Sequence, residues 1–442
     1  MKVSRNAAAI SVLIILSVAP RTANSQTRQS SRRRVVTAAS AQEQSLRSLL
    51  VQAKAAADRN DYATAAADYE KYLAQKPDDA TAHFDLGYVY TAQKENDKAI
   101  AEYRKAIAID PKMAQAYLNL GISLLGGDAK AAIAPLQKAT ELNYDYAQGH
   151  YLLGTAEERA GQSRDALKEY TIAVKLNPND YSEHMALARA ELTAGNASAA
   201  EPEFREALRL KPDVAEAKLG LAQSLLQQKQ REAAAAAFAN YLAEQPNDVQ
   251  ARVIRASLLA DLNRNDEALA ELDRAGKGTT ETLEALKLRS VLYYREKDFE
   301  KAANALQRAA VIAPQDAGIR ARLGHALLET KNYAGAAQEL NEALRLDPSS
   351  NDALRDLVAA EYLGKNYPAT MAALDLLEQR EAPKPGAWFV LATCYDHMGQ
   401  AKAALDAYRK FLAMNTDQTS NEYFEATGRV RFLERLVKEK GH

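Results

Sequence analysis

Proline recurs along this chain of 442 residues at intervals that a single repeated unit would produce. The successive intervals are 34, 67, 34, 34, 68, 34 and 35 residues, so each equals one or two lengths of one unit. The prolines concerned are Pro77, Pro111, Pro178, Pro212, Pro246, Pro314, Pro348 and Pro383. A fixed period of this length indicates a stack of small repeats, each of which buries its apolar surface only against its neighbours.

Other positions repeat in the same register. When proline is placed at position 32, eleven repeats begin near Leu46, Ala80, Ala114, Ala147, Tyr181, Ala215, Val249, Leu283, Ala317, Asn351 and Pro385. Position 20 is alanine in nine of these repeats, and position 24 is Tyr, Phe or Leu in ten. Positions 7 and 8 read Leu-Gly or Leu-Ala in seven. We number the repeats 1 to 11 in this order.

The spacing within a repeat predicts two amphipathic helices. Apolar residues stand at positions 4, 7 and 11 and again at 20, 24 and 27, which are helical intervals. Small residues at positions 8 and 20 allow the two helices to approach closely, and turn sequences such as "KEND" and "NRND" separate them. Proline ends the second helix, and Asp79, Asp180 and Asp248 are expected to cap the helix that follows.

With this pattern the chain resembles the tetratricopeptide repeat family, most fully in "AHFDLGYVYTAQKENDKAIAEYRKAIAIDP" and "GHYLLGTAEERAGQSRDALKEYTIAVKLNP". The resemblance implies an all-α fold, an α-solenoid of about eleven helix pairs wound as a right-handed superhelix over residues 42–418. Residues 419–442 are predicted to form a C-terminal capping helix and tail. Repeat 3 is one residue short, and repeat 7 ends in "AGKGTT" without proline.

The N-terminal residues are typical of an export signal. Lys2 and Arg5 precede an apolar run over residues 7–19, and "Ala23-Asn24-Ser25" supplies small residues for cleavage. We predict a signal peptide over residues 1–25, a disordered basic linker over 26–41, and localisation to the periplasm, the cell envelope or the exterior. Retention of the apolar run as a membrane anchor remains the alternative.

The sequence contains no pattern of a catalytic or cofactor site. The formal net charge of −1 disfavours nucleic acid as a partner, and there is no phosphate-binding glycine loop and no nucleophile elbow. We therefore predict no enzymatic activity, no cofactor and no metal. His83, His150 and His184 all occupy position 4, where we interpret them as half-buried packing residues.

The only cysteine, Cys394, is followed closely by Asp396 and His397, which invites a catalytic interpretation. Cys394 occupies position 10, however, which is small or apolar in every other repeat. We interpret it as a buried, unreactive spacer.

The resemblance implies partner binding on a concave face built from the first helices, mostly through positions 2, 5, 9, 12 and 13. An apolar stretch suits an extended peptide, and it comprises Phe84, Tyr88, Ile122 and Tyr151. A later stretch suits an acidic segment or a carboxylate, and it comprises Lys287, Tyr294, Arg295, Arg322, Arg355 and Tyr362. The alternatives are helix packing for the first stretch and, for the second, a solvated face offset by acids that include Asp352 and Asp356.

These observations predict an exported, non-catalytic scaffold or adaptor that binds a protein or peptide along the groove. Two alternatives stay open, an adaptor of polysaccharide secretion or outer-membrane assembly machinery, and a groove that binds a small ligand or sugar. No repeat carries the Lys and Asn pair with which some relatives hold a C-terminal carboxylate, so binding of chaperone tails is not predicted. Nothing in these residues selects one partner or one oligomeric state.

Overall fold

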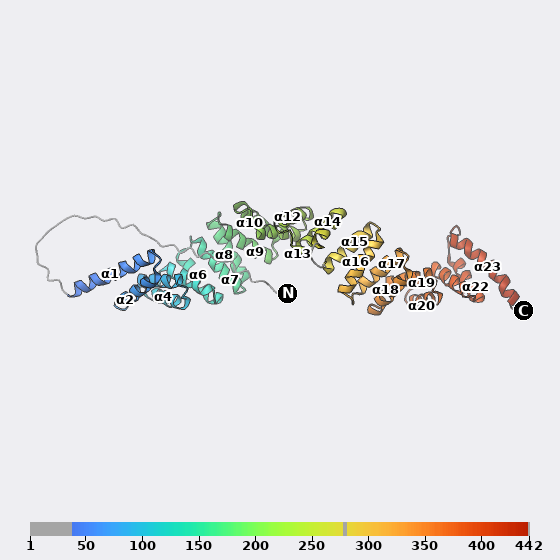
Figure 1. Cartoon of the computed structure of the whole chain (residues 1–442), viewed down its shortest axis with the longest axis horizontal. Coiled ribbons are helices and arrows are strands. Elements are labelled where there is room, and N and C mark those ends of the chain that lie inside the picture. Colours follow the sequence, from blue (N-terminus) through green and yellow to red (C-terminus); the bar gives the residue numbers. More distant parts are fainter. Residues whose placement is uncertain (1–37, 277–280, 441–442) are drawn as a thin grey trace. The chain divides into compact units, whose positions relative to one another are not determined.

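The computed structural model describes residues 38–276 and 281–440, and within them every regular element is an α-helix (Figure 1). The helices in chain order are α1 (Ala38–Asp58), α2 (Tyr62–Leu73), α3 (Ala80–Ala92), α4 (Asn96–Ile109), α5 (Ala114–Leu125), α6 (Ala129–Leu142), α7 (Ala147–Arg159), α8 (Ser163–Leu176), α9 (Tyr181–Thr193), α10 (Ala197–Leu210), α11 (Ala215–Gln227), α12 (Arg231–Glu244), α13 (Val249–Asp261), α14 (Asn265–Gly276), α15 (Leu283–Arg295), α16 (Phe299–Ile312), α17 (Ala317–Glu329), α18 (Tyr333–Leu346), α19 (Asn351–Leu363), α20 (Tyr367–Glu378), α21 (Pro385–His397), α22 (Ala401–Met414) and α23 (Asn421–Lys440).

The helices pack in sequence order within each of two compact parts, Met1–Asn119 and Leu120–His442. In the first part α1 packs on α2, α2 on α3, and α3 on α4. In the second part each helix from α6 to α23 packs on the next one, and first helices of successive repeats also touch, as in α13 with α15 and α17 with α19. The predicted all-α solenoid is thereby confirmed.

Position 20 is the point of closest approach within each helix pair. Its residue is fully buried in all eleven repeats, whether it is alanine or, in repeat 10, Thr370. Glycine at position 8 faces the ring or branched side chain at position 24. A Cβ atom on Gly87 would lie 2.7 Å from the ring of Tyr103, so this helix crossing requires glycine. The predicted role of small residues at positions 8 and 20 is confirmed.

The turn inside each repeat uses a left-handed residue at position 15. Ten repeats share this conformation, at Asn60, Lys94, Gly161, Gly195, Lys229, Asn263, Lys297, Lys331, Lys365 and Gly399. In repeat 2 the amide of Glu95, one residue later, donates to the carbonyl of Tyr90 over 2.9 Å and closes the end of α3. A lysine here carries a conformational cost that glycine avoids.

Aspartate caps the next helix after several of the prolines. The carboxylate of Asp79 accepts the amide of Ala82 at 3.0 Å, and that of Asp248 accepts the amide of Ala251 at 2.9 Å. Asp180 accepts the amide of Ser182 at 2.7 Å. All three predicted N-caps are therefore confirmed.

One predicted domain boundary, between the linker and the solenoid, differs in the structure. α1 begins at Ala38, so residues 38–41, which we predicted as part of the linker, are helical. The predicted signal and the remaining linker lie outside the described residues. The predicted capping helix corresponds to α23, which buries Leu433 against α22. No helix among residues 38–276 and 281–440 combines the length and apolar character needed to cross a bilayer.

Candidate functional site

A groove on the first helices of repeats 8, 9 and 10 forms one candidate site. It is a cavity of about 640 Å³ between α15, α17 and α19, and we call it the first-helix groove. It is lined by Val291, Tyr294, Arg295, Gly318, Ala321, Arg322, His325, Ser350, Asp352, Ala353 and Asp356. Several of these stand at positions 2, 5, 9, 12 and 13, where the resemblance implied a binding face.

An aromatic side chain fixes one wall of the first-helix groove. The hydroxyl of Tyr294 donates to the backbone carbonyl of Arg322 over 2.5 Å. Its ring stacks on His325 with centroids 5.9 Å apart and meets Phe299 edge-on at 5.5 Å. Burial raises the pKa of Tyr294, so this side chain is a neutral platform with its polar end already engaged.

Arg322 is the available cation of the groove. It is exposed, and its guanidinium forms no ion pair with any residue that the structure describes. Arg295 instead donates to the carbonyl of Ala260, at the end of α13, over 2.7 Å. Nδ1 of His325, which also lines the groove, lies 2.9 Å from the carboxylate of Asp356.

The structure brings together three of the six residues predicted in the later stretch, namely Tyr294, Arg295 and Arg322. Lys287 is not among the lining residues and pairs with Asp316 at 2.8 Å. The guanidinium of Arg295 tethers α15 to the preceding repeat, and a role for Arg295 in binding stays a prediction.

The other two predicted residues contact neighbouring helices instead. Arg355 pairs with Asp352 at 2.5 Å and Glu381 at 2.7 Å, which agrees with the alternative of an offset, solvated face. The hydroxyl of Tyr362 lies 3.1 Å from Thr393 Oγ1. Whether any of these side chains meets a partner stays a prediction.

Eight of the eleven lining residues were not among the predicted site residues, and they include His325 and Asp356. His325 occupies position 9, which was already a groove position, so the repeat register alone pointed to it. Asp356 was considered only as an acid that offsets the basic stretch. Its place in the groove depends on which face of α19 turns toward α17, and the spacing of charges does not reveal that.

The apolar stretch is divided between the two compact parts, with Phe84 and Tyr88 in the first and Ile122 and Tyr151 in the second. All four are partly buried. The ring of Phe84 lies 5.9 Å from that of Tyr103, its own position 24.

Tyr151 repeats this arrangement with Tyr170 at 6.0 Å. Position 5 therefore packs on position 24, which favours the helix-packing alternative for Phe84 and Tyr151. A role for these residues in binding stays a prediction.

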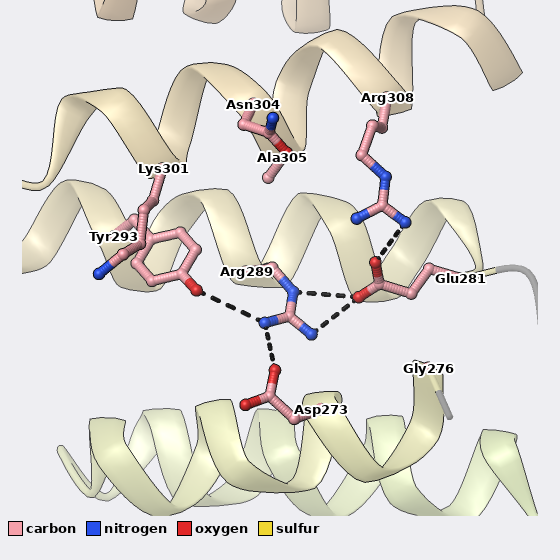
Figure 2. A pocket seen from close by; sticks show the side chains of 9 residues that line it. All are labelled: Asp273, Gly276, Glu281, Arg289, Tyr293, Lys301, Asn304, Ala305 and Arg308. Carbon is pink, nitrogen blue, oxygen red and sulfur yellow. Dashed lines mark hydrogen bonds and ion pairs between the residues drawn. The ribbon is translucent and has the colours of Figure 1, made fainter. Parts of the chain in front are cut away.

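A second cavity, of about 360 Å³, lies where repeat 7 lacks its proline (Figure 2). Arg289 stands at its centre between two acids, 2.8 Å from Glu281 and 2.6 Å from Asp273. Arg308 of α16 reaches the other oxygen of Glu281 at 2.6 Å. These charges satisfy one another, so we interpret the cluster as a staple that ties α14 to the next repeat.

Asp396 and His397, which follow Cys394, contact neighbouring helices. The thiol is buried, as predicted, and burial raises its pKa to about 11, which disfavours the reactive thiolate. That the thiol is unreactive stays a prediction. Both oxygens of Asp396 accept from Arg429 of α23 at 2.6 Å. The ring of His397 stacks on Tyr367, with centroids 4.7 Å apart.

The prediction that the three histidines at position 4 are half-buried is wrong. His83, His150 and His184 are fully buried rather than half-buried, and both nitrogens of each ring face an oxygen atom. Within the described ranges no three His, Cys, Asp or Glu side chains are grouped so that they could hold a metal ion.

Comparison with known families gives one consistent result. Models described as tetratricopeptide repeat match residues 50–114, 118–181, 151–215, 185–249, 219–281, 255–317, 293–361 and 385–418. A curated relative is the "Protein CTR9 homolog" of Arabidopsis thaliana, which is 37% identical over 75 residues. That match covers 17% of this chain and 7% of the relative, so the chain spans only a small part of its length.

Solved structures that match this chain include MamA, which is 24% identical with a TM-score of 0.37. The match covers 38% of this chain and 93% of the MamA chain. YrrB, described as a tetratricopeptide repeat protein with an unusual peptide-binding site, is 23% identical with a TM-score of 0.39. It covers 41% of this chain and 95% of its own. Yeast Tom70 is 13% identical and covers 90% of this chain and 97% of its own, with a TM-score of 0.32.

Proposed function

This chain belongs to the tetratricopeptide repeat family, and from that premise we propose that it is a non-catalytic scaffold whose partner segment binds in the first-helix groove. A stack of such repeats suits an adaptor role, because consecutive first helices offer one continuous surface to an extended chain. The groove between α15, α17 and α19 supports this proposal, since a cavity of about 640 Å³ accommodates a few side chains.

The observation that carries the proposal is the unpaired guanidinium of Arg322 beside the apolar platform of Tyr294. A guanidinium binds a carboxylate through two parallel hydrogen bonds, and the platform favours an apolar or aromatic neighbour. Asp352 and Asp356 stand on the opposite wall and disfavour a run of acids. The expected partner segment therefore has one acidic residue next to an apolar one.

Photo-crosslinking in the native cells tests this function. A benzophenone amino acid placed at Ala321, inside the groove, is expected to capture a defined protein partner. The same group at Val311, which is 80% exposed on the second helix α16, serves as the matched control and is expected to capture none. The variant Arg322→Glu reverses the charge that holds the segment, so we expect the crosslink at position 321 to fall about tenfold, while Arg322→Lys retains part of it.

Two results would contradict the proposal. One is equal capture at positions 321 and 311, and the other is capture at 321 that Arg322→Glu leaves unchanged. Because Arg322 is exposed, its replacement is not expected to unfold the repeat, and circular dichroism of the variant checks this.

The proposal includes export to the periplasm or cell envelope. It is supported by the basic start at Lys2 and Arg5, the apolar run over residues 7–19, and the small residues before Gln26. The intact mass of the protein purified from its own cells is expected to correspond to a chain that begins at Gln26. A chain in the cytosolic fraction that retains residues 1–25 would remove export from the proposal.

A further inference from the structure

One interaction recurs at position 4 in five repeats, and we call it the position-4 clamp. A cationic side chain at position 4 reaches a glutamate 19 residues later, on the second helix of its own repeat, and a backbone carbonyl six residues earlier. The five sets are His83 with Glu102 and Pro77, His150 with Glu169 and Tyr144, His184 with Glu203 and Pro178, Arg252 with Glu271 and Pro246, and Arg320 with Glu339 and Pro314.

The two ends of the position-4 clamp occur together within the chain. Where position 4 carries Lys218, Leu286, Leu354 or Trp388, the residue 19 positions later is alanine, and in repeat 3 Tyr117 is followed by Leu136. Repeat 1 is an exception, because Leu49 is followed by the buried Asp68, which pairs with Lys71 at 3.0 Å. Glutamate itself stands at this partly buried position only where a cation and a carbonyl meet it. This agrees with the high cost of burying an unpaired carboxylate.

The histidine clamps require two protons on each ring. Nδ1 lies 2.5 Å from the carboxylate of its glutamate in His83 and 2.6 Å in both His150 and His184. Nε2 lies 3.0, 3.0 and 3.1 Å from the carbonyl oxygen. A carbonyl and an ionised carboxylate only accept, whereas neutral imidazole has a single N–H, so both contacts are hydrogen bonds only for the imidazolium.

From this geometry we propose that repeats 2, 4 and 5 form a pH-sensitive segment of the solenoid, locked by protonated histidine clamps, whereas repeats 7 and 9 are locked by arginine clamps that do not titrate. When the pH rises and an imidazolium releases one proton to solvent, the neutral ring keeps its Nδ1–H toward the anionic carboxylate. The Nε2 lone pair then faces the backbone carbonyl oxygen, which also only accepts, and one hydrogen bond is lost. Arginine keeps its protons across this range.

Repeat 4 shows the effect most clearly. Burial lowers the pKa of His150, but its hydrogen bonds with Glu169 and with the carbonyl of Tyr144 outweigh burial, so that its pKa is raised above 6.5. The stabilisation is therefore complete below that value and is lost as the pH rises through the raised pKa of the folded state. The ring of Tyr144 covers the imidazole edge-on, with centroids 5.1 Å apart.

A second carboxyl group stands beside the clamp in repeat 4. Glu157 of α7 is buried, its Oε2 has no hydrogen-bond partner, and burial followed by the charges of Glu169 and Asp165 raises its pKa to about 7. Only Lys168, on α8, acts in the opposite direction. Because the folded pKa exceeds the ordinary 4.5, ionisation of Glu157 destabilises the fold as the pH rises, in the same direction as His150.

Repeat 5 is built in the same way. Glu203 of α10 meets His184, and Glu206, whose pKa is lowered chiefly by Arg209, also lies close enough for His184 to contribute to that effect. On α9 itself, Glu183 is buried with an unpartnered Oε2, and its pKa is raised to about 7, first by burial and then by Asp180. Three groups in repeats 4 and 5, namely His150, Glu157 and Glu183, thus have raised pKa values that favour the protonated form.

Repeat 2 carries the clamp without an unpartnered buried carboxyl. Asp85 of α3 accepts from the hydroxyl of Tyr69, and burial raises its pKa only to about 6, below the value of about 7 for Glu157 and Glu183. Glu102 meets His83 through one oxygen and Lys105 through the other, at 2.7 Å. Glu70 of α2 lines the same surface cavity and is bonded by the hydroxyl of Tyr90. Repeat 2 is therefore expected to respond more weakly than repeats 4 and 5.

Hydrogen exchange of the full chain at about pH 6 and about pH 8.5, corrected for the chemical exchange rate, tests the proposal. Repeats in a solenoid open locally, so α7 to α10 are expected to lose protection by about threefold or more relative to α17 and α18. The wild-type chain supplies this comparison without any substitution.

Two further variants exchange histidine and arginine at position 4 in opposite directions. His150→Arg with His184→Arg copies the arginine clamps of repeats 7 and 9, and it is expected to remove most of the pH response in α7 to α10. Arg320→His is the matched control, and it is expected to introduce a pH response into α17 and α18. Equal loss of protection in both regions of the wild-type chain would overturn the proposal, as would an unchanged pH response in the folded double variant.

Discussion

Repeats 4 and 5 differ from repeats 7 and 9 in the cation that ties their helix pairs together. Glu271 of repeat 7 is almost inaccessible and accepts from Arg252, Arg255 and Arg274, all permanent cations. Glu169 of repeat 4 meets one histidine at the same position. The same backbone geometry therefore accepts either cation, and the choice decides whether the repeat depends on pH.

The candidate binding surface includes a repeat that has an arginine clamp. The first-helix groove is built on repeats 8 to 10, and repeat 9 within it carries the Arg320–Glu339 pair at 2.7 Å. One helix pair of the groove thus rests on an arginine clamp, although the groove also holds the His325–Asp356 pair at 2.9 Å. We expect a rise in pH to loosen the position-4 clamps of repeats 4 and 5 and to leave the arginine clamp between α17 and α18 unchanged.

The largest expected effect comes from breaking an arginine clamp. Glu271→Ala leaves Arg252 and Arg255 partly buried without their acceptor, so we expect a loss of about 3–5 kcal/mol in the stability of repeat 7. Glu203→Ala in repeat 5 is the comparison, because His184 can then become neutral, and about 1–2 kcal/mol is expected. Local hydrogen exchange in α13 and α14 and in α9 and α10 measures both. Equal losses would contradict the comparison.

A smaller, pH-dependent effect is expected at Glu157. Glu157→Gln replaces a carboxyl whose pKa is raised to about 7, and its cost to the fold appears only when it ionises. We expect the variant to be more stable than the wild type by about 1 kcal/mol near pH 8 after allowance for solvent screening, and no more stable near pH 4.5. Protection of α7 and α8 at the two pH values checks this, and a gain of the same size at both would count against it.

The smallest effect concerns the left-handed turn residue, which is glycine in repeats 4 and 5 but lysine in repeat 9. Lys331→Gly removes the strain of a left-handed lysine, so we expect a gain of up to about 1 kcal/mol. Gly161→Lys should cost a similar amount in repeat 4. Thermal unfolding of the two variants measures both changes. If both substitutions changed the stability in the same direction, the left-handed turn residue would not control stability as expected.

The fold was predictable because every repeat has the same sequence pattern and forms the same pair of helices. The proline spacing, the alanine at position 20 and the caps at Asp79, Asp180 and Asp248 all act within one repeat, where sequence distance determines contact. The onset of α1 at Ala38 was missed, because residues 38–41 lie outside the repeat register and carry none of its signals.

The candidate site was only partly predictable. Position numbers placed Tyr294 on the binding face, but Arg322 stands at position 6, outside the named positions. They also did not reveal that Arg355 is paired with Glu381 in the following connection, 26 residues further along the chain. The position-4 clamps were missed for a related reason. A histidine at a packing position resembles an aromatic core residue until its glutamate and carbonyl partners, which come from three different segments, are in place.

The protonation state of the clamp histidines tests the central claim most directly. Two-bond ¹H–¹⁵N correlation spectra of the ¹⁵N-histidine-labelled chain distinguish imidazolium from the neutral ring, and the variants His83→Arg, His150→Arg and His184→Arg assign the signals. As the pH rises, we expect both ring nitrogens of His150 to keep their protons to a higher pH than those of free histidine, because its pKa is raised. Loss of the second N–H of His150 at or below the pH at which free histidine loses it would contradict the account.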